Sequence, residues 1–340
     1  MTTAHDARHV WWDIRALRAN PPGAGGLPNR KPTFSAALEQ CEQLFLAAAT
    51  VGYAARPLPL FYALSQAGRA MVAAFELSED RWQLKGHGIS SVALDSGRLW
   101  DVEQQDQRSG SFVRVAEVLH SPSLPERTRL GDLWATLPGL AGRLPTGVYR
   151  ARVLRVEREV LIGPETFGGP NVYATSVQLS SAWLYGVDPD IEFSDDPKEK
   201  LREHLTRYPS LAGFEVELAE DRPIKFHPAA VAGELGVRLT WLADGMLEEH
   251  RAERISRMCQ LAVDGSQWVA PAVAGNQQPL HPLIAWWAVL HALSMLARYE
   301  PAAWDRHRDI DASPDAAAVE SLLDQALVEV PELILHILTQ

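Results

Sequence analysis

Ten polar residues in two helical stretches and one loop could bind an anion or act on it. We call this set the seam, and it comprises Tyr62, Ser65, Gln66, Arg69, Lys85, His87, His291, Ser294, Arg298 and Tyr299. In both stretches, residues 56–77 and 281–304, the polar positions recur at three- and four-residue steps along an otherwise apolar pattern. A polar stripe inside a core is costly unless its groups are satisfied. The two stripes are therefore the first site candidates.

Arg69 allows two interpretations. It could pair with a buried carboxylate or cap carbonyl groups of the C-terminal helices, which would be a structural role. It could also offer its planar guanidinium to an anionic ligand. In the ligand-binding interpretation Arg69, Lys85 and Arg298 hold the anion. His87 and Ser294 then donate hydrogen bonds to it, and Tyr62 or Tyr299 stacks on it.

The loop that follows the first stripe carries donors between glycines. Its sequence is Lys85-Gly86-His87-Gly88. Glycines permit positive φ and close backbone approach, which loops that contact phosphates or substrates often require. The same residues suit an ordinary strand entry, so both interpretations stay open.

A third observation suggests nuclease chemistry. An arginine followed after four to six residues by a histidine matches the active-site spacing of the HEPN ribonuclease superfamily, in which the pair lies at a helix end inside a helical bundle. Three pairs meet this spacing: Arg81 and His87, Arg114 and His120, and Arg222 and His227. In a metal-independent ribonuclease, His87 would be the acid-base group, and Arg69 or Arg81 would stabilise the phosphate.

Other common catalytic signatures are missing from the sequence. We find no P-loop, GxSxG, HExxH or GxGxxG motif in a usable context. His227 and His281 each precede a proline and have no cysteine or carboxylate at metal-ligand spacing. The sequence therefore predicts no metal and no cofactor.

Composition narrows the remaining classes. The 340 residues are 46% hydrophobic and carry a formal net charge of -11, which disfavours bulk nonspecific binding to DNA or to anionic membranes. Cys41 and Cys259 lie far apart without a CxxC motif. No secretory signal pattern and no apolar run of about 20 residues occurs. We expect a cytoplasmic protein without membrane contact.

Apolar periodicity predicts helices near both ends and strands between them. The predicted helices cover residues 33–51, 56–77, 281–304 and 315–338, with a kink or break at Pro331. Shorter helices are expected at 111–119, 130–137 and 245–262. Alternating patterns predict strands within residues 90–102, 148–161, 172–184, 214–218 and 237–242.

This order predicts an α+β fold. N- and C-terminal helices form one bundle, and a largely antiparallel β-rich middle region is inserted between them. The expected divisions are an N-terminal arm at 1–30, a bundle of 31–88 plus 280–340, and a mixed, β-rich insert at 89–279.

Several segments resemble the bacterial YaaC-like protein family from about Lys31 to the C-terminus. They are RPLPLFYALSQAGRA, LKGHGI, RLGDLWATLP and HPLIAWWAVLHALSMLARYEPAAW. The resemblance implies a helical-plus-sheet protein. The family is functionally uncharacterised, so it implies no reaction and no catalytic residues.

The sequence leaves three function hypotheses. The leading one is a non-enzymatic binding or regulatory protein that recognises a nucleotide-like or other anionic ligand, with a protein partner as a subunit of a bacterial stress or anti-phage defence assembly. The alternatives are a HEPN-like metal-independent ribonuclease and a structural or interaction protein whose polar seam only supports the fold.

Overall fold

The computed structural model describes residues 4–140, 151–156, 160–162, 172–180, 202–212, 215–217, 234–242, 259–262 and 265–340. The chain divides into two compact units. The first comprises Met1–Gly147, Val273–Asn276 and Leu280–Gln340, and the second comprises Val148–Ala272 and Gln277–Pro279.

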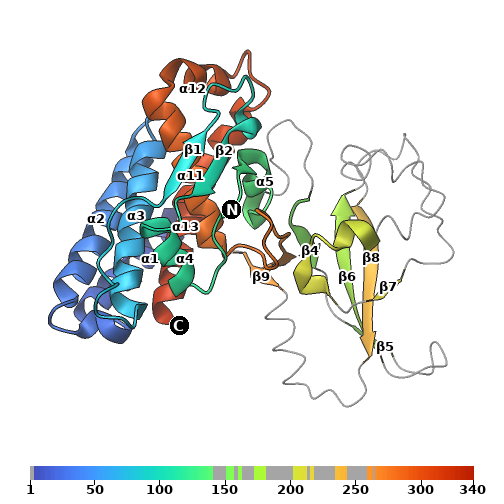
Figure 1. Cartoon of the computed structure of the whole chain (residues 1–340), viewed down its shortest axis with the longest axis horizontal. Helices are drawn as coiled ribbons and strands as arrows, with labels where there is room; N and C mark the ends of the chain where they lie inside the picture. The colour runs from blue at the N-terminus through green and yellow to red at the C-terminus, as the bar shows by residue number, and fades with distance from the viewer. Residues whose placement is uncertain are drawn as a thin grey trace. The chain divides into compact units, whose positions relative to one another are not determined.

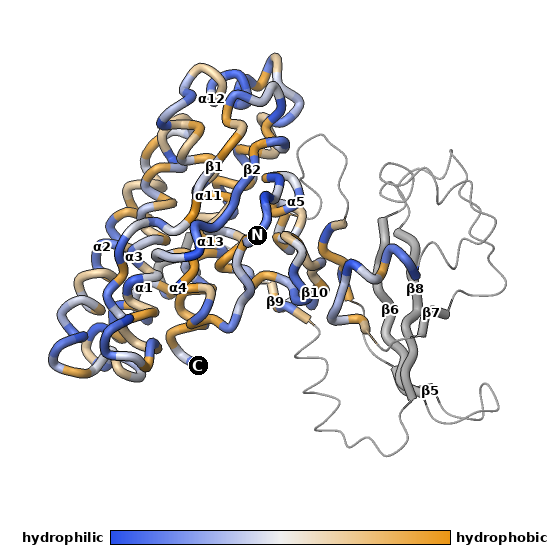
Figure 2. Tube along the Cα trace, viewed as in Figure 1, coloured by the Kyte–Doolittle hydropathy of each residue, from blue (hydrophilic) through white to orange (hydrophobic). Residues whose placement is uncertain are grey.

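Helices dominate the described part of the first unit (Figure 1). The α-helices are α1 (Ala4–Ala19), α2 (Lys31–Thr50), α3 (Pro57–Phe75), α4 (Ser111–Val118), α5 (Leu130–Trp134), α11 (Pro282–Tyr299), α12 (Pro301–Arg308) and α13 (Ala316–Thr339). Short 3-10 helices are η1 (Gly23–Gly26), η2 (Leu99–Asp101) and η3 (Pro138–Leu140). Hydrophobic and hydrophilic segments alternate along the helices, as expected for elements that bury one face (Figure 2).

The N- and C-terminal helices form one bundle, as the sequence predicts. Helix α3 packs against α2, α11 and α13, and α1 packs against α2 and α13. Side chains join the two ends of the chain: Arg56 forms an ion pair with Asp324, and the indole of Trp304 donates to the carbonyl of Ala54 over 2.9 Å. With its antiparallel sheets, the protein has an α+β fold.

A three-stranded antiparallel sheet belongs to the first unit. It consists of β1 (Ile89–Val92), β2 (Glu103–Asp106) and β3 (Thr128–Arg129), in the order β1-β2-β3. Both β1 and β2 contact α11. The sequence-based division ends the bundle at residue 88, whereas residues up to Gly147 group with the helices, because this small sheet packs on α11.

The N-terminal segment forms a helix where the sequence suggests only an arm. Val10, Trp11 and Ile14 lie on one face of α1 and are buried, and the Trp11 ring lies 5.4 Å from the ring of Phe45 on α2. These positions follow helical spacing. The Pro/Gly-rich residues after α1 form the loop and the short helix η1.

Pro301 and Pro331 have different effects on the C-terminal helices. The predicted helix 281–304 ends at Tyr299, and α12 starts at Pro301, whose missing N–H is tolerated in the first turn of a helix. Pro331 lies inside α13, which continues unbroken to Thr339. The predicted helix 281–304 is therefore longer than α11, and the break considered at Pro331 does not occur.

The second unit holds an antiparallel sheet. Its described strands are β4 (Leu154–Val156), β5 (Val160–Ile162), β6 (Val172–Ser180), β7 (Glu215–Glu217), β8 (Glu234–Leu242), β9 (Gln260–Leu261) and β10 (Gln267–Val269). They pair in the order β7-β8-β6-β4-β10-β9, with β5 beside β6, and the longest pairing joins Val172 with Leu242 through Ser180 with Glu234. The β-rich middle region is thus confirmed.

Two predictions for this region fall largely outside the described residues. Residues 245–258 of the predicted helix 245–262 are among them, whereas its last residues form strand β9. Arg222 and His227 also lie outside the described residues.

Close packing of α3 on α11 depends on one glycine. A Cβ atom at Gly68 would lie 2.6 Å from the ring of Trp287 and 2.9 Å from Val115. Trp287 is 1% exposed, so its ring cannot move into solvent. Gly68 therefore sets how closely the two seam helices approach.

We expect Gly68→Ala to lower the free energy of unfolding by about 1 to 3 kcal/mol, because overpacking outweighs the better helix propensity of alanine. The control is Gly52→Ala, since no atom lies within 4 Å of a Cβ there. Urea denaturation followed by tryptophan fluorescence measures both variants. Equal stability of Gly68→Ala and wild type would contradict the packing account.

Candidate functional site

Three elements carry the seam: α3, α11 and the loop between α3 and β1. The two helices run antiparallel, because Tyr62 contacts Arg298 while Gly68, further along α3, faces Trp287, earlier on α11. The guanidinium of Arg298 donates to the Tyr62 hydroxyl over 3.4 Å. The stripes therefore meet along one helix–helix contact.

The inner part of the seam is a closed hydrogen-bond network. His291 is buried, and its Nδ1 lies 2.8 Å from Oε1 of Gln104 and 3.2 Å from the hydroxyl of Ser91. The amide of Gln104 donates to Ser91 over 2.7 Å. Because Gln104 Oε1 can only accept, His291 Nδ1 carries the proton in this arrangement. The network attaches α11 to β1 and β2.

Burial, followed by the nearby imidazole of His87, lowers the pKa of His291 to about 3. The ring is therefore neutral near pH 7. The hydroxyl of Ser294 donates to the carbonyl of His291 over 2.8 Å, and Ser65 is also buried. The contacts of His291 and Ser294 are internal, which agrees with the structural interpretation for this half of the seam.

The outer part of the seam is exposed to solvent. Tyr62 and Tyr299 are 38% and 52% exposed, and Lys85, His87 and Arg298 are exposed as well. The guanidinium of Arg298 lies over the Tyr299 ring, 4.9 Å from its centre. This half forms an open surface of cations and phenol rings.

Arg69 and Arg298 differ from most arginines in the described part of the first unit. The side chain of Arg69 donates to the carbonyl of Leu84 over 3.1 Å, and that of Arg298 to a phenol. Neither forms an ion pair with a carboxylate among the described residues. Arginines that do form such pairs are Arg15, Arg18, Arg30, Arg56, Arg81, Arg98, Arg114, Arg127, Arg129 and Arg308.

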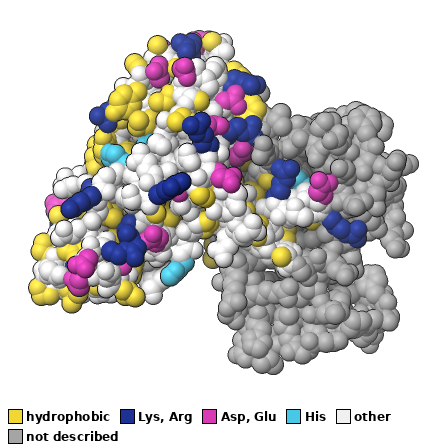
Figure 3. All heavy atoms as spheres, viewed as in Figure 1, with side chains coloured by type: hydrophobic (Ala, Val, Ile, Leu, Met, Phe, Trp, Pro, Cys, Tyr) yellow, Lys and Arg dark blue, Asp and Glu magenta, His cyan; other side chains and the backbone are white. Residues whose placement is uncertain are grey.

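Outside the seam, basic and acidic side chains are intermixed on the described surface. Figure 3 shows acidic side chains among the basic ones on the face that it presents. Like Arg69 and Arg298, Lys85 forms no ion pair with a described carboxylate. Gln66 is half-buried on the same stripe of α3, between Tyr62 and Arg69.

The backbone fixes the loop that carries His87. The carbonyl of Gly86 accepts from the amide and hydroxyl of Ser111, and the carbonyl of His87 accepts from the amide of Phe112 over 2.9 Å. Gly88 has φ +75°, and a Cβ there would lie 2.6 Å from the carbonyl oxygen of Ser109. Close backbone approach at the start of α4 therefore explains Gly88, whereas Gly86 has a φ of +69° and no atom within 4 Å of a Cβ.

His87 projects beside α3. Its ring centre lies 5.6 Å from that of Phe61, and the same Phe61 ring lies 5.1 Å from that of His291. Phe61 thus separates the exposed histidine from the buried one. No carboxylate among the described residues is paired with His87.

Two of the three arginine–histidine pairs with nuclease spacing lie among the described residues, beside α4. His87 contacts the amino end of α4, whereas Arg81 forms an ion pair at 2.5 Å with Glu117 near its carboxyl end. The contacted residues Phe112 and Glu117 are about 7.5 Å apart along the helix axis, and the Arg81 guanidinium is already paired with Glu117, so Arg81 and His87 contact different parts of α4. Arg114 lies in the middle of α4 and pairs with Glu76 and Glu117, whereas His120 follows the carboxyl end of the helix.

Sequence reasoning missed Gln104, Ser91 and Phe61. Gln104 is completely buried, although it lies in the polar segment Glu103–Asp106. Only the alternation of inward and outward positions along β2 could have indicated that Gln104 is buried. Phe61 follows the apolar pattern of α3 and carries no polar signal.

Comparison with known proteins places the chain in a family. A family model described as YaaC-like Protein matches residues 27–338. The chain belongs to the YaaC-like family. No curated protein and no solved structure matches it. The match confirms the predicted resemblance over nearly the whole YaaC-like chain.

Two searches of the described residues complete the site description. Within them, the YaaC-like chain has no helix with the length and apolar character that a membrane span requires. The same residues contain no cluster of three or more histidine, cysteine, aspartate or glutamate side chains placed to hold a metal ion.

The neutral state of His291 predicts a pH dependence. Its pKa is lower in the folded than in the unfolded protein, where it is near 6.5. The free energy of unfolding should therefore fall as pH decreases from about 6.5 towards 3, because protons bind preferentially to the unfolded chain. One such group contributes about 1.4 kcal/mol per pH unit.

His291→Gln cannot titrate in this range, so its stability should fall less steeply than that of wild type by about 1.4 kcal/mol per pH unit. Urea denaturation at pH 7, 6, 5 and 4 measures both slopes. His291→Asn serves as a second non-titrating variant. Slopes equal to that of wild type would mean that His291 is not held neutral by burial.

Proposed function

We propose that this protein is a non-enzymatic binding protein whose exposed seam recognises an anionic, nucleotide-like ligand. The observation that carries the proposal is that three seam cations have no described carboxylate partner and that one of them, Arg298, contacts two exposed tyrosines. Arg69, Lys85 and Arg298 form no ion pair with a described acidic side chain, although the chain has a net charge of -11. Such a local excess of positive charge attracts anions.

The side chains suit both parts of a nucleotide. Guanidinium groups bind phosphate through paired, charge-assisted hydrogen bonds. Tyr62 and Tyr299 are exposed aromatic residues of the kind on which bases stack, and Arg298 covers one face of the Tyr299 ring. Arg298 contacts both tyrosines, so a single ligand can reach cation and ring together.

Binding is better supported than catalysis. His87 is exposed on the same loop as Lys85, but its neighbour His291 is neutral and engaged with Gln104. General acid-base catalysis of phosphodiester cleavage uses positioned proton donors and acceptors. The contacts of His87 supply no such partner among the described residues, and Arg81 lies at the other end of α4. A role in a defence assembly stays a prediction.

We expect Arg298→Met to weaken nucleotide binding by about 10- to 100-fold, because a hydrogen bond to a charged group contributes about 1.5 to 3 kcal/mol. Isothermal titration calorimetry with ADP, ATP and inorganic phosphate measures the effect. Arg18→Met is the matched control, since Arg18 pairs with Glu39 on an exposed surface away from the seam. Arg69→Lys tests whether charge alone suffices.

Three outcomes would contradict the proposal. Wild type could fail to bind any of these anions at millimolar concentration, which would favour a purely structural seam. Arg298→Met and Arg18→Met could bind equally well. Wild type could also cleave a fluorescent RNA in the presence of a chelator and lose this activity in His87→Ala, which would favour a metal-independent ribonuclease.

A further inference from the structure

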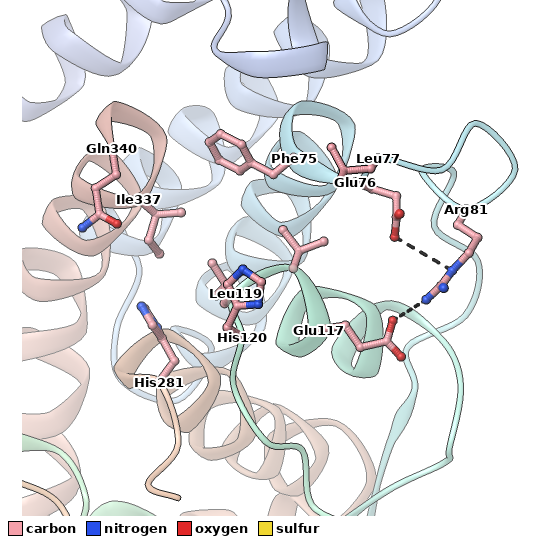
Figure 4. Close-up of a pocket in the computed structure, with 11 residues that line it drawn as sticks. Phe75, Glu76, Leu77, Arg81, Glu117, Leu119, His120, His281, Ile337 and Gln340 are labelled. Atoms are coloured by element: carbon pink, nitrogen blue, oxygen red, sulfur yellow. Dashed lines mark hydrogen bonds and ion pairs between the residues drawn. The ribbon is translucent and has the colours of Figure 1, made fainter. Parts of the chain in front are cut away.

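A separate pocket lies at the carboxyl ends of α3 and α4, beside the start of α11 and the end of α13. Its volume is about 740 Å³, within the range of small-molecule sites. Figure 4 shows imidazole rings on one side of it and an ion-pair cluster on the other. It contains no seam residue, so it is independent of the proposed function.

His120 occupies a position that normally favours glycine. Its φ is +51°, and it follows α4, where the amide of Ser121 donates to the carbonyl of Ala116 over 2.9 Å and that of His120 to Glu117 over 3.1 Å. This left-handed helix ending is disfavoured for residues with a Cβ atom. Nevertheless a histidine is present, and its imidazole lines the pocket. Such strained positions cluster at functional sites.

His281 presents a second imidazole from the start of α11. Its Nδ1 accepts a hydrogen bond of 3.1 Å from the amide of Leu283, so the proton of the neutral ring is on Nε2. Burial, and next the charge of His336, lowers the pKa of His281 to about 4. The ring is therefore a neutral donor at pH 7.

The other charges of the pocket are already balanced. Arg81 and Arg114 both pair with Glu117 and with Glu76, which gives two cations and two anions. The two imidazoles are therefore the polar groups that remain available to a ligand head group. Phe75, Leu119 and Ile337 supply an apolar wall, and Leu77, which also lines the pocket, is 93% exposed.

We propose that this pocket binds a small amphipathic carboxylate, with its head group on His120 and His281 and its hydrocarbon part against Phe75, Leu119 and Ile337. Each imidazole can donate a hydrogen bond to the carboxylate. The titratable groups that face them are His336 on α13 and the ion-pair cluster of Glu76, Arg81, Arg114 and Glu117.

Octanoate is the probe, and octanamide is its uncharged analogue. Isothermal titration calorimetry of the full chain at pH 7, where the octanoate carboxyl group is ionised, should show saturable octanoate binding. Octanamide should bind at least about tenfold more weakly, because it brings no charge to the imidazoles.

Two variants distinguish a loss of octanoate binding from a loss of stability. His120→Gly should weaken octanoate binding by about tenfold while leaving the melting temperature unchanged or higher, because glycine fits the left-handed position. His281→Asn preserves a good N-cap residue and should also weaken binding. Ala274→Gly, at another non-glycine residue with positive φ, is the matched control and should bind octanoate like wild type.

Several results would overturn the proposal. They are no octanoate binding at millimolar concentration, equal binding of octanamide, or unchanged affinity in His120→Gly. A lower melting temperature of His120→Gly would also overturn it, because it would show that the histidine supports the fold. All of these outcomes leave nucleotide binding at the seam unaffected.

Discussion

The contact between Gly68 and Trp287 is the constraint on which the arrangement of the seam depends. Because Gly68 has no side chain, α3 can approach the face of α11 that carries a large buried indole. The antiparallel pair then brings Tyr62 next to Arg298 at one end. The same approach buries His291 against Phe61, so the contact that stabilises the core also determines which seam residues reach solvent.

The seam consequently has two halves with different physical roles. Inside, His291, Gln104 and Ser91 satisfy one another, and a buried network of this kind fixes how the small sheet sits on α11. Outside, cations and tyrosines face water without acidic partners among the described residues. A buried neutral imidazole supports the fold, whereas an exposed guanidinium beside a ring is available to a ligand.

Much of the fold could be predicted from the sequence, because helical periodicity is strong near both ends of the chain. The boundaries of α3 and α13 agree closely with their apolar patterns. The burial of Gln104 and the separation of Arg81 from His87 could not be predicted. Both depend on tertiary packing. The side chain of Gln104 points inward from the short strand β2, and Arg81 and His87, only six residues apart in sequence, contact different parts of α4.

The most direct test is nuclear magnetic resonance of protein with ¹³C-labelled histidine and tyrosine rings during titration with ADP. The account predicts that resonances of His87, Tyr62 and Tyr299 shift with saturation, while those of His120 and His281 in the separate pocket do not. Loss of these shifts in Arg298→Met would confirm that the exposed seam holds the anion. Saturating shifts confined to other rings, or none at all, would contradict the account.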